Sequence, residues 1–222
     1  MTHLLVLRPE PGSSATVDKA RRLGLNAIAM PLFQIEPVAW QAPAPSAFDG
    51  LLLTSANAVR HAGSQLWQLR ALPVYAVGEA TASEARDAGL VVAATGDGGV
   101  EKLLRSVDPE LRLLHLCGLH RKSPDDASQQ ITSVPVYHAQ TKTIEIAKLM
   151  SGVALIHSPR AAARFADLVE PGARGSISIA AISNEALGMA GEGWAAAEAA
   201  ENPSDEALLV LAARLCNKTD AQ

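Results

Sequence analysis

Hydroxyl-bearing and small residues recur in this sequence directly after short apolar runs. Ser55 follows the run GLLLT and Ser158 follows the run VALIH. If such runs are parallel strands, these residues lie where strands lead into helices, which is where ligands bind in parallel sheets. Backbone N–H groups and the helix dipole favour a carboxylate or phosphate there by about 0.3–1 kcal/mol per exposed helix end. The pattern therefore predicts an anionic ligand, and the candidate residues are Thr54, Ser55, Gly78, Thr81, Ser158, Ser183, Asn184 and Ser204.

Each of these residues also has a simpler alternative role. Ser, Thr, Asp and Asn are preferred N-caps of helices, including helices that bind nothing at that end. Ser55 and Ser158 are the stronger candidates because they occupy equivalent positions in an internal repeat, and Pro159 suits the first turn of a helix.

A few side chains could supply positive charge or a proton donor. Arg8 follows the first apolar run, and Gly118 leads into a cationic loop that contains Arg121 and Lys122. An ordinary solvated loop is the alternative for that segment. Tyr137 lies in a long extended segment, from which its phenol could act as an acid or a hydrogen-bond donor, with aromatic packing as the alternative.

Other kinds of chemistry find little support in the sequence. The six histidines form no HExxH or Cys/His ligand spacing, so no metal site is expected. There is no GxSxG turn for a hydrolase, and the run from Gly96 to Gly99 lacks the pattern of a nucleotide-binding loop. Cys117 and Cys216 lie far apart in the sequence, which favours reduced thiols over a disulfide. We therefore expect no cofactor.

Charge and hydropathy narrow the class of protein. The 19 Lys and Arg residues against 23 Asp and Glu residues give a net charge of -4 without a basic tail, so nucleic acid is not an expected partner. No apolar run reaches the roughly 20 residues that a membrane-spanning helix needs. The N-terminal segment lacks the basic leader and apolar core of a signal peptide. These features predict a soluble cytoplasmic protein.

An internal repeat organises the chain. The segment FDGLLLTSANAVR at 48–60 matches VALIHSPRAAAR at 153–164, and VYAVGEATASEARDAGL at 74–90 matches IAAISNEALGMAGEGW at 179–194. Residues 27–33 match 131–137 and residues 101–104 match 206–209, with a nearly constant offset of about 104 residues. Four matches in one order predict two similar lobes, and a cleft between lobes is where a small molecule is expected to bind.

The alternation of short apolar runs with Ala-rich segments of helical spacing predicts an α/β fold, in which each lobe is a parallel sheet flanked by helices. Two long extended segments, 27–38 and 131–143, carry prolines, which disfavour a central position in a sheet. These equivalent segments are therefore candidates for a pair that joins the lobes.

The joint pattern resembles the uroporphyrinogen-III synthase family over nearly the whole chain. FDGLLLTSANAV and VYAVGEATA are the most specific segments, and LLVLRPEP, AIAMPLFQIEP, HLCG, VPVYHAQ, LIHSPRAAARF and ENPSDEALL also match. The resemblance implies two α/β lobes joined by a two-stranded antiparallel linker. It places the first lobe at residues 1–34 plus 144–222, the second lobe at 38–137, and the linker segments at 35–37 and 138–143.

The same resemblance implies a lyase that cyclises hydroxymethylbilane, a linear tetrapyrrole with eight carboxylates. The product is uroporphyrinogen III, formed in haem biosynthesis with loss of water and inversion of the last pyrrole ring, without a cofactor and, as we expect, by a monomer. The linear molecule closes without inversion when left alone, so catalysis rests on positioning and electrostatics. Tyr137 is expected to donate a hydrogen bond to the departing hydroxyl. Motif matches also carry over Thr54, Ser55, Thr81 and Ser158 as substrate-binding residues, together with Arg8 and the Gly118 to Lys122 loop.

The chain departs from the family pattern at residues 183–186, which read SNEA where many relatives have small and Thr residues. Glu185 adds a carboxylate near a polyanionic ligand, so either it points away or this half of the site binds differently. Two alternatives therefore stay open. One is a two-lobed protein that binds an anionic small molecule without converting it, and the other is a degenerate family member that retains the fold.

Overall fold

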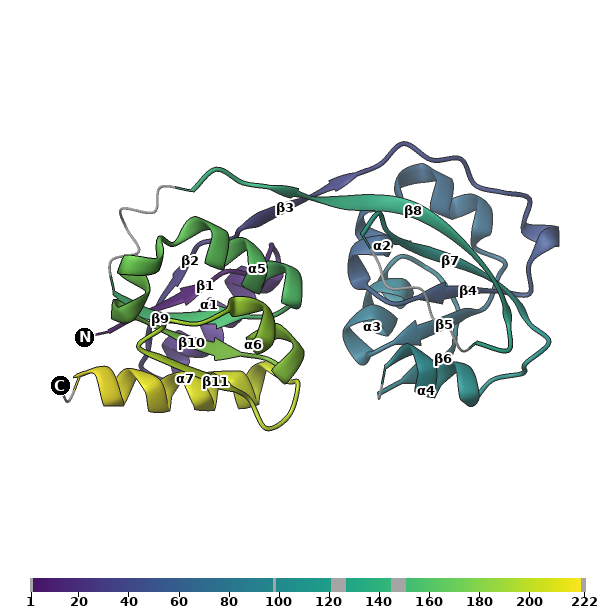
Figure 1. Ribbon diagram of the computed structural model, residues 1–222. Coiled ribbons are helices and arrows are strands. Elements are labelled where there is room, and N and C mark those ends of the chain that lie inside the picture. The colour runs from purple at the N-terminus through teal and green to yellow at the C-terminus, as the bar shows by residue number, and fades with distance from the viewer. Residues whose placement is uncertain (1, 98, 121–126, 145–150, 221–222) are drawn as a thin grey trace. The chain divides into compact units, whose positions relative to one another are not determined.

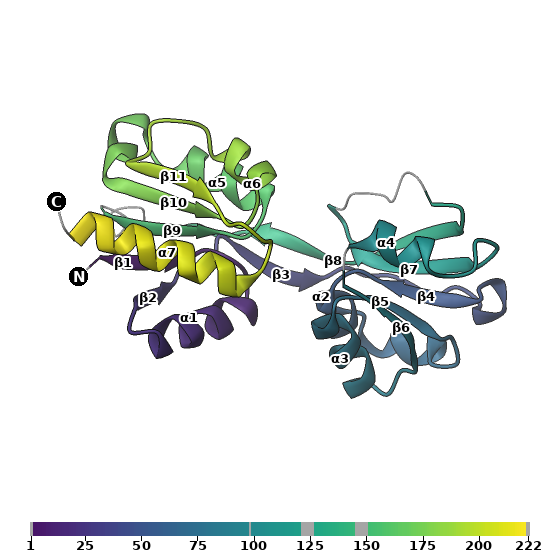
Figure 2. The same ribbon diagram turned by 90° about the horizontal axis from the view of Figure 1, so that it is seen from below.

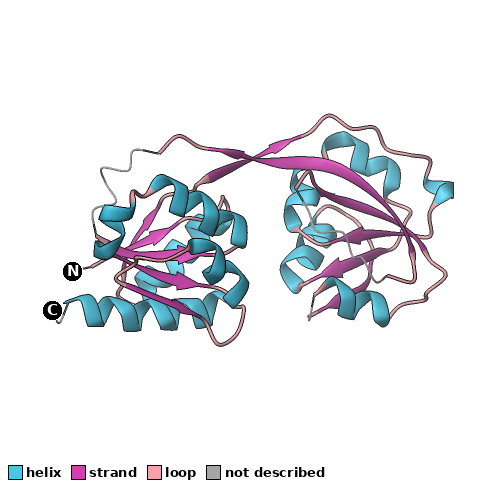
Figure 3. Cartoon of the chain, viewed as in Figure 1, coloured by secondary structure: helices cyan, strands magenta, loops and turns pink. Residues whose placement is uncertain are grey.

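The chain folds into two compact units, which Figure 1 shows as a computed structural model. Unit 1 comprises residues 1–34 and 141–222, and unit 2 comprises residues 35–140. The structure describes residues 2–97, 99–120, 127–144 and 151–220. Within these ranges, no helix combines the length and the apolar character that crossing a membrane requires. Each unit is a single sheet with helices packed on it, as the magenta strands and cyan helices of Figure 3 show.

The sheet of unit 1 has five strands in the order β11-β10-β9-β1-β2, and every neighbouring pair is parallel. The three central strands are largely buried, whereas most residues of the two edge strands, β2 and β11, are exposed or half-buried. The strands are β1 (His3–Val6), β2 (Asn26–Ala29), β9 (Gly152–Ile156), β10 (Ile177–Ala181) and β11 (Ala196–Ala199). Because all of them run in one direction, they end at the same edge of the sheet, which we call the carboxyl edge.

Helices cover both faces of this sheet (Figure 2). α1 (Gly12–Arg22) and α7 (Asp205–Asp220) share one apolar core with the strands, to which Val17 and Leu208 contribute. α5 (Pro159–Leu168) and α6 (Asn184–Ala190) pack together, and a short 3-10 helix at Pro171–Ser176 leads into β10. The strand order reverses between β1 and β9, since the chain runs from β1 to β2 on one side and from β9 to β10 on the other. Ligands of open parallel sheets bind beyond the carboxyl edge at such a switch point.

The sheet of unit 2 has the order β3-β8-β7-β4-β5-β6, and the pairs from β8 to β6 are parallel. Its order reverses between β4 and β7. The strands are β3 (Phe33–Pro37), β4 (Gly50–Leu53), β5 (Val74–Val77), β6 (Val92–Gly96), β7 (Arg112–Gly118) and β8 (Gln130–Thr141).

The helices of unit 2 bury two separate apolar clusters against this sheet. α2 (Ala56–His61), α3 (Glu79–Asp87) and the 3-10 helix Gly63–Leu69 share one cluster, and α4 (Val100–Arg105) belongs to the other. A further 3-10 helix, Pro45–Ala47, precedes β4. Unit 2 therefore has the same layered construction as unit 1.

The two units share one strand order and one register. Five strands of unit 2, in the order β6-β5-β4-β7-β8, correspond to β11-β10-β9-β1-β2 of unit 1. The equivalent pairs around the switch points are Leu4–Val153 and Leu4–Ala27 in unit 1, and Leu113–Gly50 and Leu113–Ile131 in unit 2. Val153 lies 103 residues after Gly50, and Ile131 lies 104 residues after Ala27. The predicted fold class of two similar α/β lobes is therefore confirmed, and the sequence repeat has a structural counterpart.

The chain passes between the units within β3 and β8, which are neighbours in the sheet order. The backbone N–H of Val38 donates a hydrogen bond of 3.0 Å to the carbonyl oxygen of Val136. The backbone N–H of Lys142 donates one of 2.9 Å to the carbonyl oxygen of Leu32. Residue numbers therefore rise along one segment as they fall along the other, which is the register of an antiparallel pair.

Candidate functional site

A partly buried carboxylate lies at the switch point of unit 1. The carboxylate of Asp205, at the start of α7, is 14% exposed. It accepts hydrogen bonds from the Thr16 hydroxyl at 3.0 and 3.2 Å and from Nε2 of His157 at 3.0 Å. Nη1 of Arg8 and Nζ of Lys19 approach it to 3.5 and 3.4 Å. Of these five residues, only Arg8 was predicted from the sequence as a site residue.

Hydrogen bonding decides the charge state of Asp205. Desolvation by burial would raise the pKa of its carboxyl, but the hydrogen bonds from His157 and Thr16 and the charge of Arg8 outweigh burial and hold the pKa well below its usual range. Asp205 is therefore ionised at neutral pH.

The imidazole of His157 is neutral at the same pH, because burial lowers its pKa and the bond to Asp205 only partly opposes this. A carboxylate only accepts hydrogen bonds, so Nε2 of His157 carries the hydrogen. Its Nδ1 is then a buried acceptor that has no hydrogen-bond partner among the described residues.

Three of the candidate serines begin helices along the carboxyl edge of unit 1. Ser158 follows β9, Ser183 follows β10, and Ser204 follows β11. Each Oγ accepts a hydrogen bond of 3.2 Å from the backbone N–H three residues later. They are thus N-caps whose hydroxyl hydrogens are still able to donate. Asn184, also a candidate, is the exposed first residue of α6.

Replacing Ser158 with Ala should therefore affect stability as well as any ligand. Loss of an N-cap costs about 1 kcal/mol of folding free energy. For a chain of this size, that corresponds to a fall of roughly 2–4 °C in the melting temperature. Ser158→Asn, which retains an N-cap oxygen, should recover most of that loss in a thermal melt. Equal melting temperatures for Ser158→Ala and the wild type would contradict the capping role.

The switch point of unit 2 carries a buried histidine between two hydroxyl groups. His115 of β7 is 1% exposed. Its Nε2 lies 3.0 Å from Oγ1 of Thr54, at the end of β4, and its Nδ1 lies 3.3 Å from Oγ of Ser133 on β8. Thr54 was predicted as a substrate-binding residue, whereas His115 and Ser133 were missed. A histidine within the apolar run LLHLCG was the one signal in the sequence that pointed to them.

Tyr137 lies beside the end of β7, opposite Gly118 in the strand register. Burial raises the pKa of its phenol above the ordinary value, and a hydrogen bond with the side chain of Ser55 partly opposes this increase. The phenol is therefore protonated at neutral pH and able to donate a hydrogen bond. A Cβ atom on Gly118 would lie 2.9 Å from Cζ and 3.1 Å from Oη of Tyr137. Glycine at 118 thus makes the space that the phenol ring occupies.

The remaining candidates of unit 2 lie near the same edge. Ser55 caps α2, since its Oγ accepts from the backbone N–H of Asn57 at 3.2 Å. Gly78 is the N-cap residue of α3. Thr81 is in the first turn of α3 and is only 5% exposed, so it offers little surface to a ligand in this conformation. Arg121 and Lys122 lie outside the described residues. Tyr137 lies within β8, beside the end of β7. Within each unit, the other described candidates lie at strand ends of the carboxyl edge or at the helix starts that follow them.

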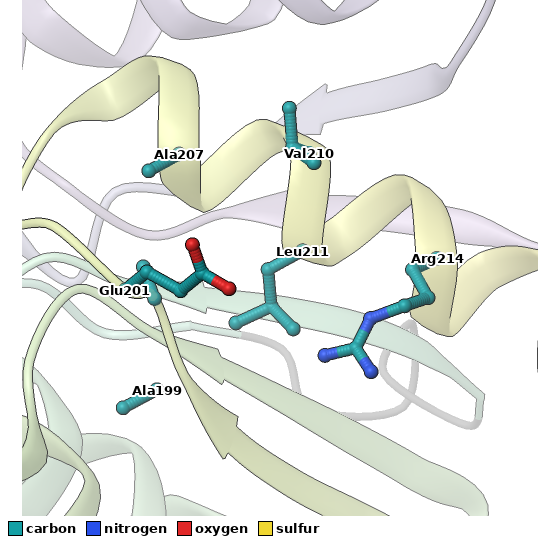
Figure 4. A pocket seen from close by; sticks show the side chains of 7 residues that line it. Ala199, Glu201, Ala207, Val210, Leu211 and Arg214 are labelled. Atoms are coloured by element: carbon teal, nitrogen blue, oxygen red, sulfur yellow. The ribbon is translucent and has the colours of Figure 1, made fainter.

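Two surface pockets lie apart from these residues. One, of about 590 Å³ in unit 1, lies between the end of β11 and α7. Figure 4 shows Glu201 and Arg214 on either side of Leu211 in this pocket. The other, of about 260 Å³ in unit 2, is lined by Trp67, Leu66 and Arg60 among others. Neither is lined by a candidate residue from the sequence.

Comparison with known proteins places the chain in a family. Residues 14–210 match the family model described as uroporphyrinogen-III synthase HemD. A curated relative from Chlorobaculum parvum, named uroporphyrinogen-III synthase, is 30% identical over 101 residues, and this match spans 41% of each protein.

Two solved structures have the same fold. The uroporphyrinogen-III synthetase of Helicobacter pylori has a TM-score of 0.69 at 19% identity, covering 97% of this chain and 100% of that one. A mutant uroporphyrinogen III synthase of Thermus thermophilus has a TM-score of 0.56 at 17% identity, covering 98% and 100%. At these identities the structures bear on the fold, whereas the family match spans most of the sequence. The chain belongs to the uroporphyrinogen-III synthase family.

Proposed function

We propose that this protein is a cofactor-independent uroporphyrinogen-III synthase. It would act as a lyase that cyclises hydroxymethylbilane, with loss of water and inversion of the last pyrrole ring, in haem biosynthesis. The observation that carries this proposal is the family match over residues 14–210. We also propose that the protein is a cytoplasmic monomer. Its expected partner is this small molecule and not a nucleic acid.

Tyr137 is the residue that we assign to the departing hydroxyl. The C–O bond of the hydroxymethyl group must break, and the oxygen gains negative charge as it leaves. A phenol kept protonated by burial can donate a hydrogen bond to that oxygen and stabilise the charge. The leaving oxygen gains a proton and departs as water, and the last ring loses a proton after the new carbon–carbon bond has formed, so that the overall change is the loss of one water molecule. Gly118 supports this role because the absence of a side chain there leaves the space that the phenol occupies.

We assign binding of the substrate carboxylates to hydrogen-bond donors at the carboxyl edges of the two sheets. Arg8 offers a charged guanidinium, and Ser158, Ser183 and Ser204 offer hydroxyl hydrogens beside the positive ends of helices. Thr54 and Ser55 do the same in unit 2. These local donors let a chain with a net charge of -4 bind a substrate that carries eight carboxylates.

The proposal is tested by incubating the purified protein with freshly generated hydroxymethylbilane, followed by oxidation and chromatographic separation of the type I and type III isomers. We expect type III to dominate, and the activity to survive chelation and dialysis because no cofactor is used. Tight binding of hydroxymethylbilane without conversion would instead support a binding protein or a degenerate family member. A loss of activity that one specific metal restores would contradict cofactor independence.

A further inference from the structure

The guanidinium of Arg8 is held against the first residue of α1. A Cβ atom on Gly12 would lie 2.5 Å from Nε and 2.8 Å from Cζ of Arg8. Such distances are far shorter than an ordinary contact between non-bonded heavy atoms, which is about 3.5–4.0 Å for carbon. The arginine can therefore occupy this position only because residue 12 has no side chain.

Asp205 holds the guanidinium through a second contact. Its Oδ1 lies 3.5 Å from Nη1 of Arg8, and the Thr16 hydroxyl lies 3.4 Å from the same nitrogen. The carboxylate is itself fixed by hydrogen bonds from Thr16 and His157, whose side chain is 7% exposed. Lys19 contacts the other oxygen, Oδ2, at 3.4 Å. The arginine is thus held by groups from α1, α7 and the end of β9.

This arrangement leaves donors of Arg8 available at the switch point. In the described part of the chain, the hydrogen bonds found for the guanidinium are made through Nη1. The side chain is 36% exposed, at the end of β1 and next to β9. A guanidinium presents its N–H groups in a fixed fork that matches the two oxygens of a carboxylate. A guanidinium held in one orientation also loses less conformational freedom when it binds such a group.

We propose that Gly12 and Asp205 are positioning residues that hold Arg8 as a preformed site for one carboxylate of the tetrapyrrole substrate. The inference rests on the proposed function, since the ligand is the substrate named there. It goes beyond that function by assigning roles to Gly12, Asp205, Thr16 and His157. Arg8 contacts the carboxylate, and the other residues act through Arg8.

The decisive variant is Gly12→Ala, because it displaces the arginine without removing any polar group. Alanine is favoured over glycine in helices, and the atoms it meets are the end of a flexible side chain, so the melting temperature should stay equal or rise. Losing the charge-assisted hydrogen bond between Arg8 and a substrate carboxylate should weaken binding enough to raise KM for hydroxymethylbilane roughly 10-fold. The turnover number kcat should be unchanged, since the contact serves ground state and transition state alike.

Two comparisons separate this role from a merely structural one. Gly188→Ala in α6 is the matched control, because a Cβ atom there meets nothing within 4 Å, and its KM should equal that of the wild type. The double variant Arg8→Ala/Gly12→Ala should have the same KM as Arg8→Ala alone, because Gly12 acts through Arg8. A Gly12→Ala enzyme with wild-type KM, or additive effects in the double variant, would overturn the inference.

A binding titration distinguishes failure of the inference from failure of the proposed reaction. Uroporphyrin III, the oxidised form of the expected product, carries eight carboxylates and can be titrated by its fluorescence. Gly12→Ala and Arg8→Ala should each weaken its binding roughly 10-fold relative to the wild type and to Gly188→Ala. If the two variants bind uroporphyrin III more weakly but the wild type forms no type III product, the proposed reaction is refuted while the carboxylate site is supported. Equal binding by all four proteins would refute the site, whatever the activity.

Discussion

Tyr137→Phe is expected to lower kcat for hydroxymethylbilane by roughly 10²-fold. Assistance by a positioned acid or donor contributes about 10² to 10⁴ in rate, and water or a neighbouring hydroxyl can replace part of a phenol's effect, which favours the lower bound. The ring of phenylalanine retains the packing over Gly118, so folding should be nearly unaffected. Steady-state kinetics and a thermal melt on the same preparation measure both quantities. A variant with wild-type kcat would leave aromatic packing as the role of Tyr137.

Gly118→Ala provides an independent check on that role. The added Cβ atom would lie 2.9 Å from Cζ of Tyr137, so the ring must move while its hydroxyl is kept. Overpacking of this kind typically costs about 1–3 kcal/mol of stability, and kcat should fall because the donor is displaced. The double variant Gly118→Ala/Tyr137→Phe should then turn over no more slowly than Gly118→Ala alone. A clear further decrease would mean that the two residues act separately.

Asp205→Asn is expected to lower the free energy of unfolding by about 2 kcal/mol at pH 7, because it weakens several hydrogen bonds to a charged acceptor. The side chain of Asp205 is 14% exposed, but those of Arg8 and Lys19 are 36% and 39% exposed, so solvent screens their part of this contribution. Denaturant unfolding of wild type and variant gives the difference. Asp49→Asn is a useful comparison, since Asp49 pairs with Arg112 at the surface and should contribute less. If Asp205→Asn lowered the free energy of unfolding no more than Asp49→Asn does, the hydrogen bonds that Asp205 accepts from Thr16 and His157 would not stabilise the fold as we expect.

The effect of Asp205 should also depend on pH in a defined direction. Its pKa is lowered in the folded protein, so its stabilising contribution is fully present above the unfolded-state pKa of about 3.9 and is lost as the pH falls toward the folded pKa. The difference in stability between wild type and Asp205→Asn should therefore shrink by about 1 kcal/mol between pH 5 and pH 3. A difference that stays constant over this range would show that ionisation of Asp205 does not stabilise the fold.

The architecture was largely accessible from the sequence because it rests on local patterns. Apolar runs such as GLLL and VALI end where polar residues begin, and these ends mark the strand termini. The repeat offset of 103 to 104 residues reappears in the pairing register of both sheets. Strand ends therefore pointed to Ser55 and Ser158, although the sequence could not show that both are N-caps.

The partners of the candidate residues were not accessible in the same way. Thr16 and Asp205 are 189 residues apart, and they meet only because α1 and α7 cover the same face of one sheet. No spacing rule links them. His115 and Ser133 belong to neighbouring strands whose pairing the sequence did not reveal. The roles of Gly12 and Gly118 depend on which side chain packs over each glycine, which is a property of the folded chain alone.

The most direct test of the proposed function is the fraction of type III isomer formed at increasing protein concentration. Hydroxymethylbilane closes spontaneously to the type I isomer, so the two routes compete for one substrate. If the protein catalyses closure with inversion, the type III fraction should rise with protein concentration until nearly all the product is type III. A product that stays at the spontaneous type I composition at every concentration would contradict the assignment of this activity.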